Sequence, residues 1–256
     1  MSHGNPIISV SGLSKIFGTV RAVDNINFTV SAGSITGLLG ANGAGKSTTI
    51  AMLLGLIIPT CGKVEIFGLD MLKTRHTALA HMNFSSPYID LPQRLTGTQN
   101  LTVYARLYGL SNIPHRLAKL AEELHLSGFI NRPYRTLSSG QKTRIMLAKS
   151  LLNEPKLLLL DEPTASLDPD TADWIRQYLV NYQRRTNAAI LLASHNMPEV
   201  EQLCDQVLML QGGNIITRGT PAELIKTHGA GTLEEVFLAV ARQNKNTPLR
   251  SVRYEK

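Results

Sequence analysis

The sequence predicts an α/β fold built around a mostly parallel β-sheet. Apolar runs at 157–160 and 188–194 have the composition of buried strands, and a helical pattern follows each of them, at 171–185 and from Pro198 onward. Buried strands that alternate with helices indicate a parallel sheet covered by helices on both faces. A further apolar run, at 35–39, leads through a glycine-rich loop into another helix.

The N-terminal part of the chain predicts several more strands. Short β-rich runs at 7–10, 27–30 and 34–39 alternate with turn residues. A helix is expected over 47–57, where the proline that follows ends it. A short strand over 63–68 closes this half of the chain.

Helical periodicity dominates between about 98 and 152. Apolar residues recur on one face of each expected helix, at Leu101, Ala105 and Tyr108 and at Leu117, Leu120, Ala121 and Leu124. Near the C-terminus, residues 232–240 predict an amphipathic helix that packs through Leu233, Phe237 and Val240. From Arg242 onward the chain is polar, and we expect a frayed tail.

Length, composition and cysteine usage exclude several classes of protein. The 256 residues have a mean hydropathy of −0.02 and 43 % hydrophobic content, which is typical of a globular domain with a sizeable core. The longest apolar stretch, at 50–58, is too short to span a bilayer, and the first ten residues lack a secretory signal. Cys61 and Cys204 form no CxxC spacing, so we expect free thiols in a reducing cytosol.

The formal net charge of +7 is distributed unevenly along the chain. Residues 73–155 contain 11 basic and 4 acidic side chains, whereas residues 156–241 contain 6 and 11. A basic stretch is most often a solvated helix face, but it also suits an anionic ligand, a membrane surface or an acidic partner. Charge alone does not distinguish these possibilities.

Residues 40–47, Gly-Ala-Asn-Gly-Ala-Gly-Lys-Ser, match the pattern GxxxxGK[ST] in full. The strand expected before this loop and the helix expected after it are the context in which the pattern binds phosphate. Its glycines let backbone N–H groups turn toward phosphate oxygens, and the helix N-terminus adds its positive dipole end. We expect Lys46 to reach the β- and γ-phosphates and Ser47 to bind Mg²⁺. The loop therefore predicts a nucleoside triphosphate site.

Two adjacent carboxylates, Asp161 and Glu162, follow the apolar strand at 157–160. Ligands bind at the C-terminal edge of parallel sheets in this class of fold. We expect Asp161 to hold Mg²⁺, directly or through water, and Glu162 to take a proton from an attacking water molecule. Such a pair could instead cap the next helix, but beside a phosphate loop it favours hydrolysis.

Residues 137–141, Leu-Ser-Ser-Gly-Gln, open a further helical segment. Ser138 and Gly140 suit a second phosphate-binding helix start, which uses a hydroxyl cap and a bare backbone, although an ordinary N-cap looks the same. Together with the phosphate loop, LLLLDEPTASLD at 157–168 and LLASHN at 191–196, this segment closely resembles the ATP-binding cassette (ABC) ATPases. The resemblance covers about residues 7–241.

The resemblance implies a P-loop NTPase fold of ABC type. Such a fold has a mostly parallel core sheet, an antiparallel β subdomain and an inserted helical subdomain. The expected organisation is a single ABC ATPase domain over 5–240, with the helical subdomain at about 95–153, and a basic, flexible tail at 241–256. ATP and Mg²⁺ are the expected cofactors. The resemblance assigns nucleotide binding to Phe17, Asn42, Gly43, Gly45, Lys46, Ser47 and Thr48, the metal to Ser47 and Asp161, and catalysis to Glu162 and His195.

In this family two ATPase domains pair head to tail and enclose two ATP molecules between them. The signature residues Ser138, Ser139, Gly140 and Gln141 would then serve the partner's nucleotide. Asp168 in the D-loop would pass information across the interface, and His195 would contact the γ-phosphate and orient the attacking water. Phe17 resembles the aromatic residue that stacks on adenine, with a core phenylalanine as the alternative. A histidine after a strand is otherwise most often a surface or packed residue.

Two positions depart from the family's pattern. Ser139 stands where the usual LSGGQ motif has a second glycine. The Q-loop normally carries a glutamine after a strand, and the flanking sequence places Ser85 there, or less well Ser86. A serine hydroxyl is shorter than a carboxamide and reaches the metal or the water only if the loop moves inward. Slower hydrolysis is the resulting hypothesis.

The final segment, 232–240, resembles the end of ATPase subunits of ABC-2-type exporters. We therefore expect an ATP-hydrolysing subunit that forms a homodimer, drives export through a separate transmembrane permease and lies on the cytoplasmic face of the cell membrane. An importer ATPase is the nearest alternative, followed by a soluble ABC ATPase acting on nucleic acid or ribosomes. A non-enzymatic nucleotide-binding module is disfavoured by Glu162 and His195. No nucleic-acid partner is expected, and the basic region 73–155 is expected to face the membrane subunit.

Overall fold

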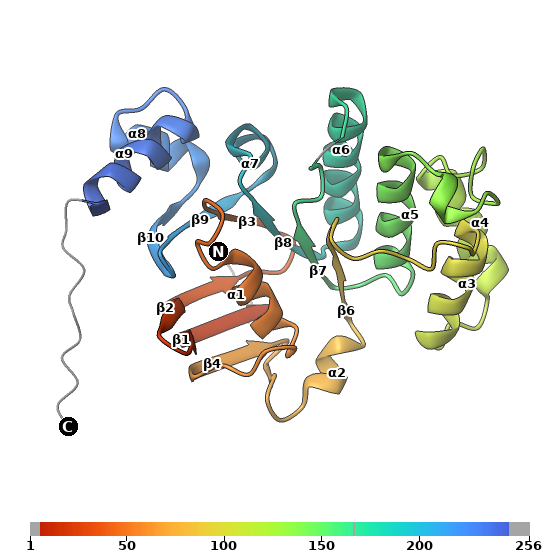
Figure 1. Cartoon of the computed structure of the whole chain (residues 1–256), viewed down its shortest axis with the longest axis horizontal. Helices are drawn as coiled ribbons and strands as arrows, with labels where there is room; N and C mark the ends of the chain where they lie inside the picture. Colours follow the sequence, from red (N-terminus) through yellow and green to blue (C-terminus); the bar gives the residue numbers. More distant parts are fainter. Residues whose placement is uncertain (1–5, 166, 246–256) are drawn as a thin grey trace.

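A computed structural model of the chain describes residues 6–165 and 167–245 and contains two β-sheets with helices around them (Figure 1). The larger sheet has six strands, five of them parallel, and β10 pairs antiparallel with β9 at one edge. In spatial order its strands are β10 (Asn214–Gly219), β9 (Gln206–Gln211), β3 (Ile35–Leu39), β8 (Ala189–Ser194), β7 (Leu157–Asp161) and β6 (Met82–Ser85). The predicted α/β class with a mostly parallel core sheet is confirmed.

The smaller sheet is antiparallel and has four strands. In spatial order they are β2 (Val20–Val30), β1 (Ile8–Phe17), β4 (Cys61–Ile66) and β5 (Leu69–Asp70). Strands β1 and β2 extend well beyond the short runs predicted at 7–10 and 27–30. The register between them shifts three times between Val10 and Ile16, so the alternation of apolar and polar residues is interrupted along both strands.

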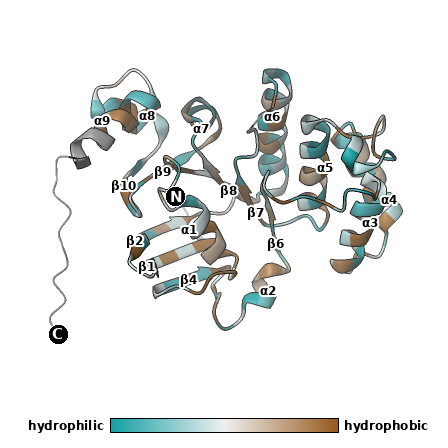
Figure 2. Cartoon of the chain, in the orientation of Figure 1, coloured by the Kyte–Doolittle hydropathy of each residue, from teal (hydrophilic) through white to brown (hydrophobic). Residues whose placement is uncertain are grey.

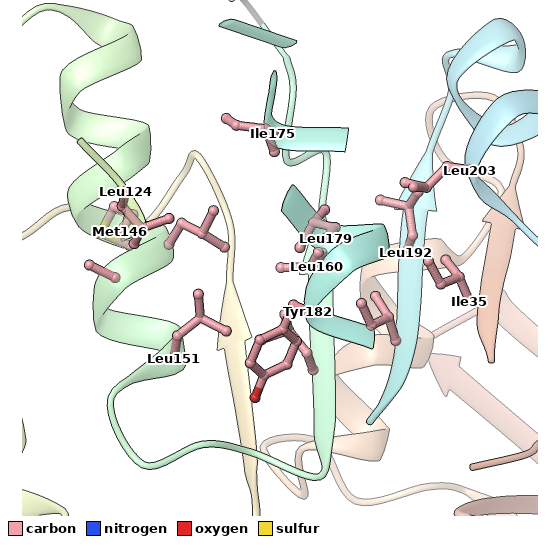
Figure 3. Packing of buried hydrophobic residues seen from close by; sticks show 14 of the residues in the cluster. Ile35, Leu124, Met146, Leu151, Leu160, Ile175, Leu179, Tyr182, Leu192 and Leu203 are labelled. Carbon is pink, nitrogen blue, oxygen red and sulfur yellow. The ribbon is translucent and has the colours of Figure 1, made fainter. Parts of the chain in front are cut away.

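Alternating side chains of the central strands enter two separate layers of the core. On β7, Leu157 and Leu159 face the cluster that includes α1 (Lys46–Leu53) and the antiparallel sheet. Leu158 and Leu160 face the cluster that includes α6 (Pro169–Thr186), as Figure 3 shows for Leu160. Figure 2 shows hydrophobic residues along these strands, whereas α6 carries both hydrophobic and hydrophilic residues. A strand buried on both faces explains its uninterrupted run of leucines.

The helices between β6 and β7 form a lobe beside the central sheet (Figure 1). They are α3 (Gly97–Leu107), α4 (Ile113–Glu123), the 3-10 helix η1 (Tyr134–Thr136) and α5 (Ser139–Leu151). Helix α6 connects this lobe to the sheet, because Glu123 of α4 accepts hydrogen bonds from Tyr178 at 2.9 Å and from Arg185 at 3.0 Å. Met146 and Leu151 of α5 belong to the same core cluster as Leu160.

Helix α1 ends earlier than the sequence predicts. The predicted helix over 47–57 is wrong only over 54–57, because α1 ends at Leu53 and Gly55 adopts the left-handed conformation, with φ 67°. The N–H of Gly55 donates to the carbonyl of Met52 at 3.0 Å, which closes the last turn in the usual manner of a glycine C-terminus. The short helix α2 (Arg75–Leu79) lies between β5 and β6.

Three helices complete the C-terminal half: α7 (Met197–Leu203), α8 (Pro221–His228) and α9 (Leu233–Lys245). Leu233 and Val240 of α9 are buried as predicted, whereas Phe237 is only half-buried and Val236, which was not predicted, is fully buried. Helix α9 continues through Lys245, and the rest of the predicted tail lies outside the described residues. Among the helices of residues 6–165 and 167–245, none is long and apolar enough to cross a membrane.

Candidate nucleotide-binding and hydrolysis site

The phosphate loop joins β3 to α1 and is closely surrounded by backbone. A Cβ atom added to Gly40 would lie 2.6 Å from the carbonyl oxygen of Leu210 on β9, and one added to Gly45 would lie 2.5 Å from that of Ala22 on β2. Gly45 also has φ 105°, a conformation that side-chain-bearing residues rarely adopt. By contrast, Gly43 (φ 80°) has open space around its Cβ position, so its bare backbone faces outward.

Lys46, the first residue of α1, is buried at this loop. Its ammonium Nζ donates hydrogen bonds to the carbonyl oxygens of Gly40 at 2.6 Å and Ala41 at 3.3 Å. Burial lowers the pKa of Lys46, and the nearby carboxylates of Glu162 and Asp161 oppose this shift only in part. The structure thus places one partly desolvated cation directly over the loop that is expected to bind phosphate.

Ser47 and Asp161 bring two oxygen atoms together from different elements. Ser47 Oγ lies 3.3 Å from Asp161 Oδ2, at the start of α1 and the end of β7. Burial and the charge of Glu162 raise the pKa of Asp161, while Ser47 and Lys46 oppose that rise. A hydroxyl and a carboxylate suit Mg²⁺, which usually takes its other ligands from phosphates and water. The described residues contain no cluster of three or more His, Cys, Asp or Glu side chains that could bind a metal.

Glu162 is held in position by its backbone and by the segment after β8. Its N–H donates to the carbonyl of Ala193 at 2.8 Å, and its φ of 50° turns the chain sharply after β7. The carboxylate is buried, and its Oε1 lies 2.6 Å from Nδ1 of His195 and accepts the His195 backbone N–H at 3.1 Å. The histidine side chain itself is 59 % exposed. The two residues predicted to be catalytic therefore meet, and His195 is not a packed core histidine.

A second buried carboxylate near this pair, Glu199, did not emerge from the sequence. Glu199 lies on α7 and is 2 % exposed, and burial raises its pKa although hydrogen bonds from Thr164 and Ser194 oppose the shift. In the sequence it stands between Pro198 and Val200 in a short polar helix, where a glutamate is ordinarily solvent-exposed. Its only sequence signal is its position one helical turn after the segment that carries His195.

The remaining residues predicted to bind nucleotide are exposed or half-buried. Phe17 ends β1 and is 46 % exposed, with Nζ of Lys15 5.0 Å from its ring centre. A core role for this phenylalanine is therefore excluded, whereas an exposed ring remains available for stacking on a flat ligand. Asn42 is exposed in the loop, and Thr48 is half-buried on α1.

The signature residues begin α5, which lies apart from α1 in Figure 1. Ser138 and Gln141 form a capping box, in which the Ser138 hydroxyl accepts the Gln141 N–H at 3.3 Å and Gln141 Oε1 accepts the Ser138 N–H at 3.1 Å. Ser138 and Ser139 are exposed. A Cβ added to Gly140 would make only ordinary contact, 3.5 Å from Thr171. Packing within this chain therefore does not require glycine at position 140.

Asp168 is the N-cap of α6. Its Oδ1 accepts the Thr171 N–H at 2.9 Å, and its hydrogen bonds with Thr171 lower its pKa. Because Asp168 caps this helix, Asp161 and Glu162 do not, which excludes the capping alternative for the acidic pair. Ser85 ends β6 and Ser86 follows it, and both line a cavity of about 400 Å³ together with Asp161 and Glu162. The predicted Q-loop position thus lines the same cavity as the residues predicted to act in hydrolysis.

These features define a class of protein: a P-loop ATPase with a phosphate loop, a carboxylate in contact with the serine of that loop, and a paired glutamate and histidine. Comparison with known proteins agrees with this class. The family model described as ABC transporter matches residues 23–165, more than half of the chain. The chain belongs to the ABC transporter family, and it is an ATP-binding ATP hydrolase, the ATPase subunit of an ABC transporter.

Individual relatives support the same assignment. The Nod factor export ATP-binding protein I of Ralstonia nicotianae is 38 % identical over 88 % of this chain and 70 % of its own length. The probable multidrug ABC transporter ATP-binding protein YbhF of Escherichia coli is 34 % identical over 92 % of this chain but only 42 % of its own length. The structure of cbiO1 from Clostridium perfringens, part of the ABC transporter complex cbiONQ, superposes with a TM-score of 0.80 at 27 % identity, covering 94 % of this chain and 98 % of that one.

Proposed function

We propose that this chain hydrolyses ATP, as one of two identical subunits, to drive export through a separate membrane-spanning permease. The observation that carries the hydrolysis is the pairing of Glu162 with His195, next to the Ser47–Asp161 pair. A site that only binds nucleotide needs the phosphate loop, but it does not need a carboxylate and an imidazole beside the metal position.

In the proposed reaction, Glu162 accepts a proton from the water that attacks the γ-phosphorus of ATP. The new bond joins the water oxygen to phosphorus, and the bond from phosphorus to the β–γ bridging oxygen breaks, which releases ADP and phosphate. His195 holds Glu162 through Nδ1, which leaves its other ring nitrogen to bind the γ-phosphate and orient the water. Lys46 binds the β- and γ-phosphates. Mg²⁺, held by Ser47 and Asp161, would offset negative charge on the phosphate oxygens.

The second subunit would complete the site from the opposite side. Ser138 and Gly140 are exposed or half-exposed at the N-terminus of α5, where backbone N–H groups and the helix dipole favour an anion. The hydroxyl of Ser138 accepts a hydrogen bond within its own chain, so its hydrogen can still be donated to a phosphate. The surface at Gly140 can accept a closely approaching ligand because no side chain covers it. Ser139, Gln141 and Asp168 would line the same interface.

Export is the favoured direction of transport because two relatives carry export or multidrug names over most of this chain's length. An importer ATPase is the alternative. The permease would hold this subunit at the cytoplasmic face of the membrane. The basic region 73–155, which includes the helical lobe, would face that permease.

Replacing Glu162 by Gln tests the hydrolytic assignment. The carboxamide keeps the size of the side chain but cannot take a proton, so turnover should fall by about 10²–10⁴-fold. The affinity for ATP, measured by equilibrium binding, should stay within about threefold of the wild type because the phosphate loop is untouched. In sedimentation experiments with ATP, this variant should persist as a dimer, whereas the wild type should return to monomers as ATP is consumed.

Glu65→Gln is a matched control, since Glu65 lies on β4 of the antiparallel sheet and pairs with the exposed Lys63. Its turnover should equal that of the wild type. Normal turnover in the Glu162→Gln protein would overturn the catalytic assignment. A monomer in the presence of ATP would overturn the dimer assignment.

A further inference from the structure

Glu199 joins the two chain segments that carry the paired residues Glu162 and His195. Its Oε1 accepts the hydroxyl hydrogen of Thr164 at 2.5 Å, and Thr164 follows Glu162 by two residues. Its Oε2 accepts a hydrogen bond from Ser194 at 3.0 Å, and Ser194 directly precedes His195. One carboxylate from α7 thus fixes the loop after β7 against the end of β8.

The Ser194 hydroxyl lies between two carboxylates. Ser194 Oγ is 3.0 Å from Glu199 Oε2 and 3.4 Å from Glu162 Oε2, and it also accepts the Asn196 N–H at 3.0 Å. A hydroxyl has one hydrogen to donate, so the shorter contact directs that hydrogen toward Glu199. Glu199 therefore takes the Ser194 hydrogen, and Glu162 Oε2 keeps a position that this hydroxyl does not occupy as a donor.

Burying the carboxylate of Glu199 costs free energy that only its hydrogen bonds can offset. Glu199 is 2 % exposed, and moving such a group out of water is unfavourable even when it is paired. An apolar residue of similar size would fill the space between α7 and the sheet at a lower cost, as Val200 and Leu203 do on the same helix. The carboxylate is therefore needed for its hydrogen bonds with Thr164 and Ser194, because packing alone does not need an acceptor at this position.

We propose that Glu199 is a positioning residue for ATP hydrolysis, which acts through Ser194 and Thr164 to hold the Glu162–His195 pair in its reactive arrangement. This inference rests on the proposed role of Glu162 as the proton acceptor. It adds a residue whose hydrogen bonds lie outside the phosphate loop: within residues 6–165 and 167–245, Glu199 bonds with Thr164, Ser194 and Asn196.

The test compares steady-state ATPase kinetics of Glu199→Ala and Glu199→Gln with the wild type. For Glu199→Ala, kcat should fall by about tenfold to a hundredfold, because the two catalytic segments lose their common acceptor. KM for ATP and the equilibrium affinity for ATP should change by less than about threefold. Glu199→Gln keeps an acceptor for Thr164, and its amide can donate to Ser194, so it should recover part of kcat.

A double-mutant cycle separates positioning from general stabilisation. If Glu199 acts through Ser194, then Ser194→Ala should itself lower kcat, and Glu199→Ala should lower it little further in that background. Glu201→Ala is the matched control on the same helix, since Glu201 accepts a hydrogen bond from Leu233 of α9 at 3.1 Å and contacts neither catalytic segment. Its kcat should equal that of the wild type, whatever its change in melting temperature.

Wild-type kcat in both Glu199 variants would overturn the inference. So would a loss of kcat accompanied by an equal loss of ATP affinity, because that pattern reports a damaged fold. If Glu199→Ala does not fold, Glu199→Gln keeps the side-chain volume and carries the same test. Turnover that survives Glu162→Gln would instead overturn the proposed function. An inactive Glu162→Gln protein with normal Glu199 variants would overturn only the role of Glu199.

Discussion

The phosphate loop and the start of α5 are the two helix starts that the sequence predicts to bind phosphate, and they are built in opposite ways. Around the loop, Lys46 donates to the carbonyl of Gly40 at 2.6 Å and Ser47 lies 3.3 Å from Asp161. Glycine is required at positions 40 and 45 because neighbouring backbone leaves no room for a side chain. At the start of α5, the hydroxyls are exposed, and Gly140 has ordinary clearance. The packing of its own chain determines the shape of the loop, whereas packing within the chain does not determine the residues at the start of α5.

Packing within the chain does not require glycine at position 140. A ligand or partner that approaches from outside the chain would explain the glycine. If two copies pair head to tail, each loop is complete except for the groups that the other copy's α5 supplies. Three experiments test this contrast, and the largest effect is expected from damaging the two helix starts in different copies.

Lys46→Ala and Gly140→Asp should each lower turnover by about 10²-fold or more, since each removes or blocks one side of every site. Both variants should fold, because a Cβ at position 140 has space within its own chain. When the two proteins are mixed, random pairing makes half of the dimers mixed, and each mixed dimer has one undamaged site. The mixture should therefore recover about a quarter of wild-type turnover, measured by phosphate release.

Each variant alone, at the total concentration of the mixture, is the control. A mixture as inactive as its parents would show that the signature residues do not serve a partner's nucleotide. Full turnover of Gly140→Asp alone would show that no ligand approaches that position.

Asp161→Asn should lower turnover by about tenfold to a hundredfold, because the amide is a weaker ligand for Mg²⁺. Without nucleotide or metal it should raise the free energy of unfolding by about 1 kcal/mol, since a buried charge is removed while an acceptor for Ser47 is kept. The folded pKa of Asp161 is raised, so the wild type loses stability as the pH rises through that pKa. The gain from Asn should therefore be full at pH 7.5 and should vanish below the unfolded pKa.

Denaturant titrations of both proteins at several pH values provide the measurement. Asp168→Asn is the control, because Asp168 is an exposed N-cap and asparagine caps equally well. It should change stability little. A pH-independent gain in the Asp161→Asn protein would contradict the assignment of the effect to charge burial.

Ser85→Gln should raise turnover by about threefold, the smallest of the expected effects. Ser85 lines the cavity that also contains Asp161 and Glu162, and a longer carboxamide can reach toward them from the end of β6. Ser86→Gln is the comparison, since Ser86 is 6 % exposed and its hydroxyl accepts the Tyr88 N–H at 3.3 Å. It should not raise turnover. Unchanged activity in the Ser85→Gln protein would contradict the hypothesis that serine slows hydrolysis.

Much of the fold and of the loop side of the site could be predicted from local sequence. The apolar runs of β3, β7 and β8 are buried on both faces, so composition alone identifies them as parallel core strands. Because parallel neighbours end at one edge of the sheet, the residues that follow β7 and β8 had to meet there, as Glu162 and His195 do. Glu162 and His195 could both be predicted because each directly follows a recognisable strand.

Features that depend on distant or irregular contacts were not predictable in the same way. The hairpin of β9 and β10 was missed, although Gly212 and Gly213 between apolar runs are a turn signal. Helix α1 was predicted too long because its end depends on one left-handed glycine, Gly55, inside an apolar run. Glu199 was missed because its burial depends on how α7 packs on the sheet, and the local pattern of α7 contains nothing that distinguishes it from the half-buried Glu201.

At position 162 the backbone also limits how this enzyme can change during evolution. A φ of 50° costs most L-residues about 1–2 kcal/mol and disfavours β-branched residues strongly, whereas asparagine and glycine adopt it readily. The backbone conformation at position 162 therefore limits which residues the fold tolerates there, apart from any effect on catalysis. Several of those that the shape admits would leave the phosphate loop intact but remove the proton acceptor. One or two base changes could thus convert this ATPase into a stable subunit that binds ATP and does not hydrolyse it. Such a subunit could pair with an unchanged copy to give a dimer with two unequal sites.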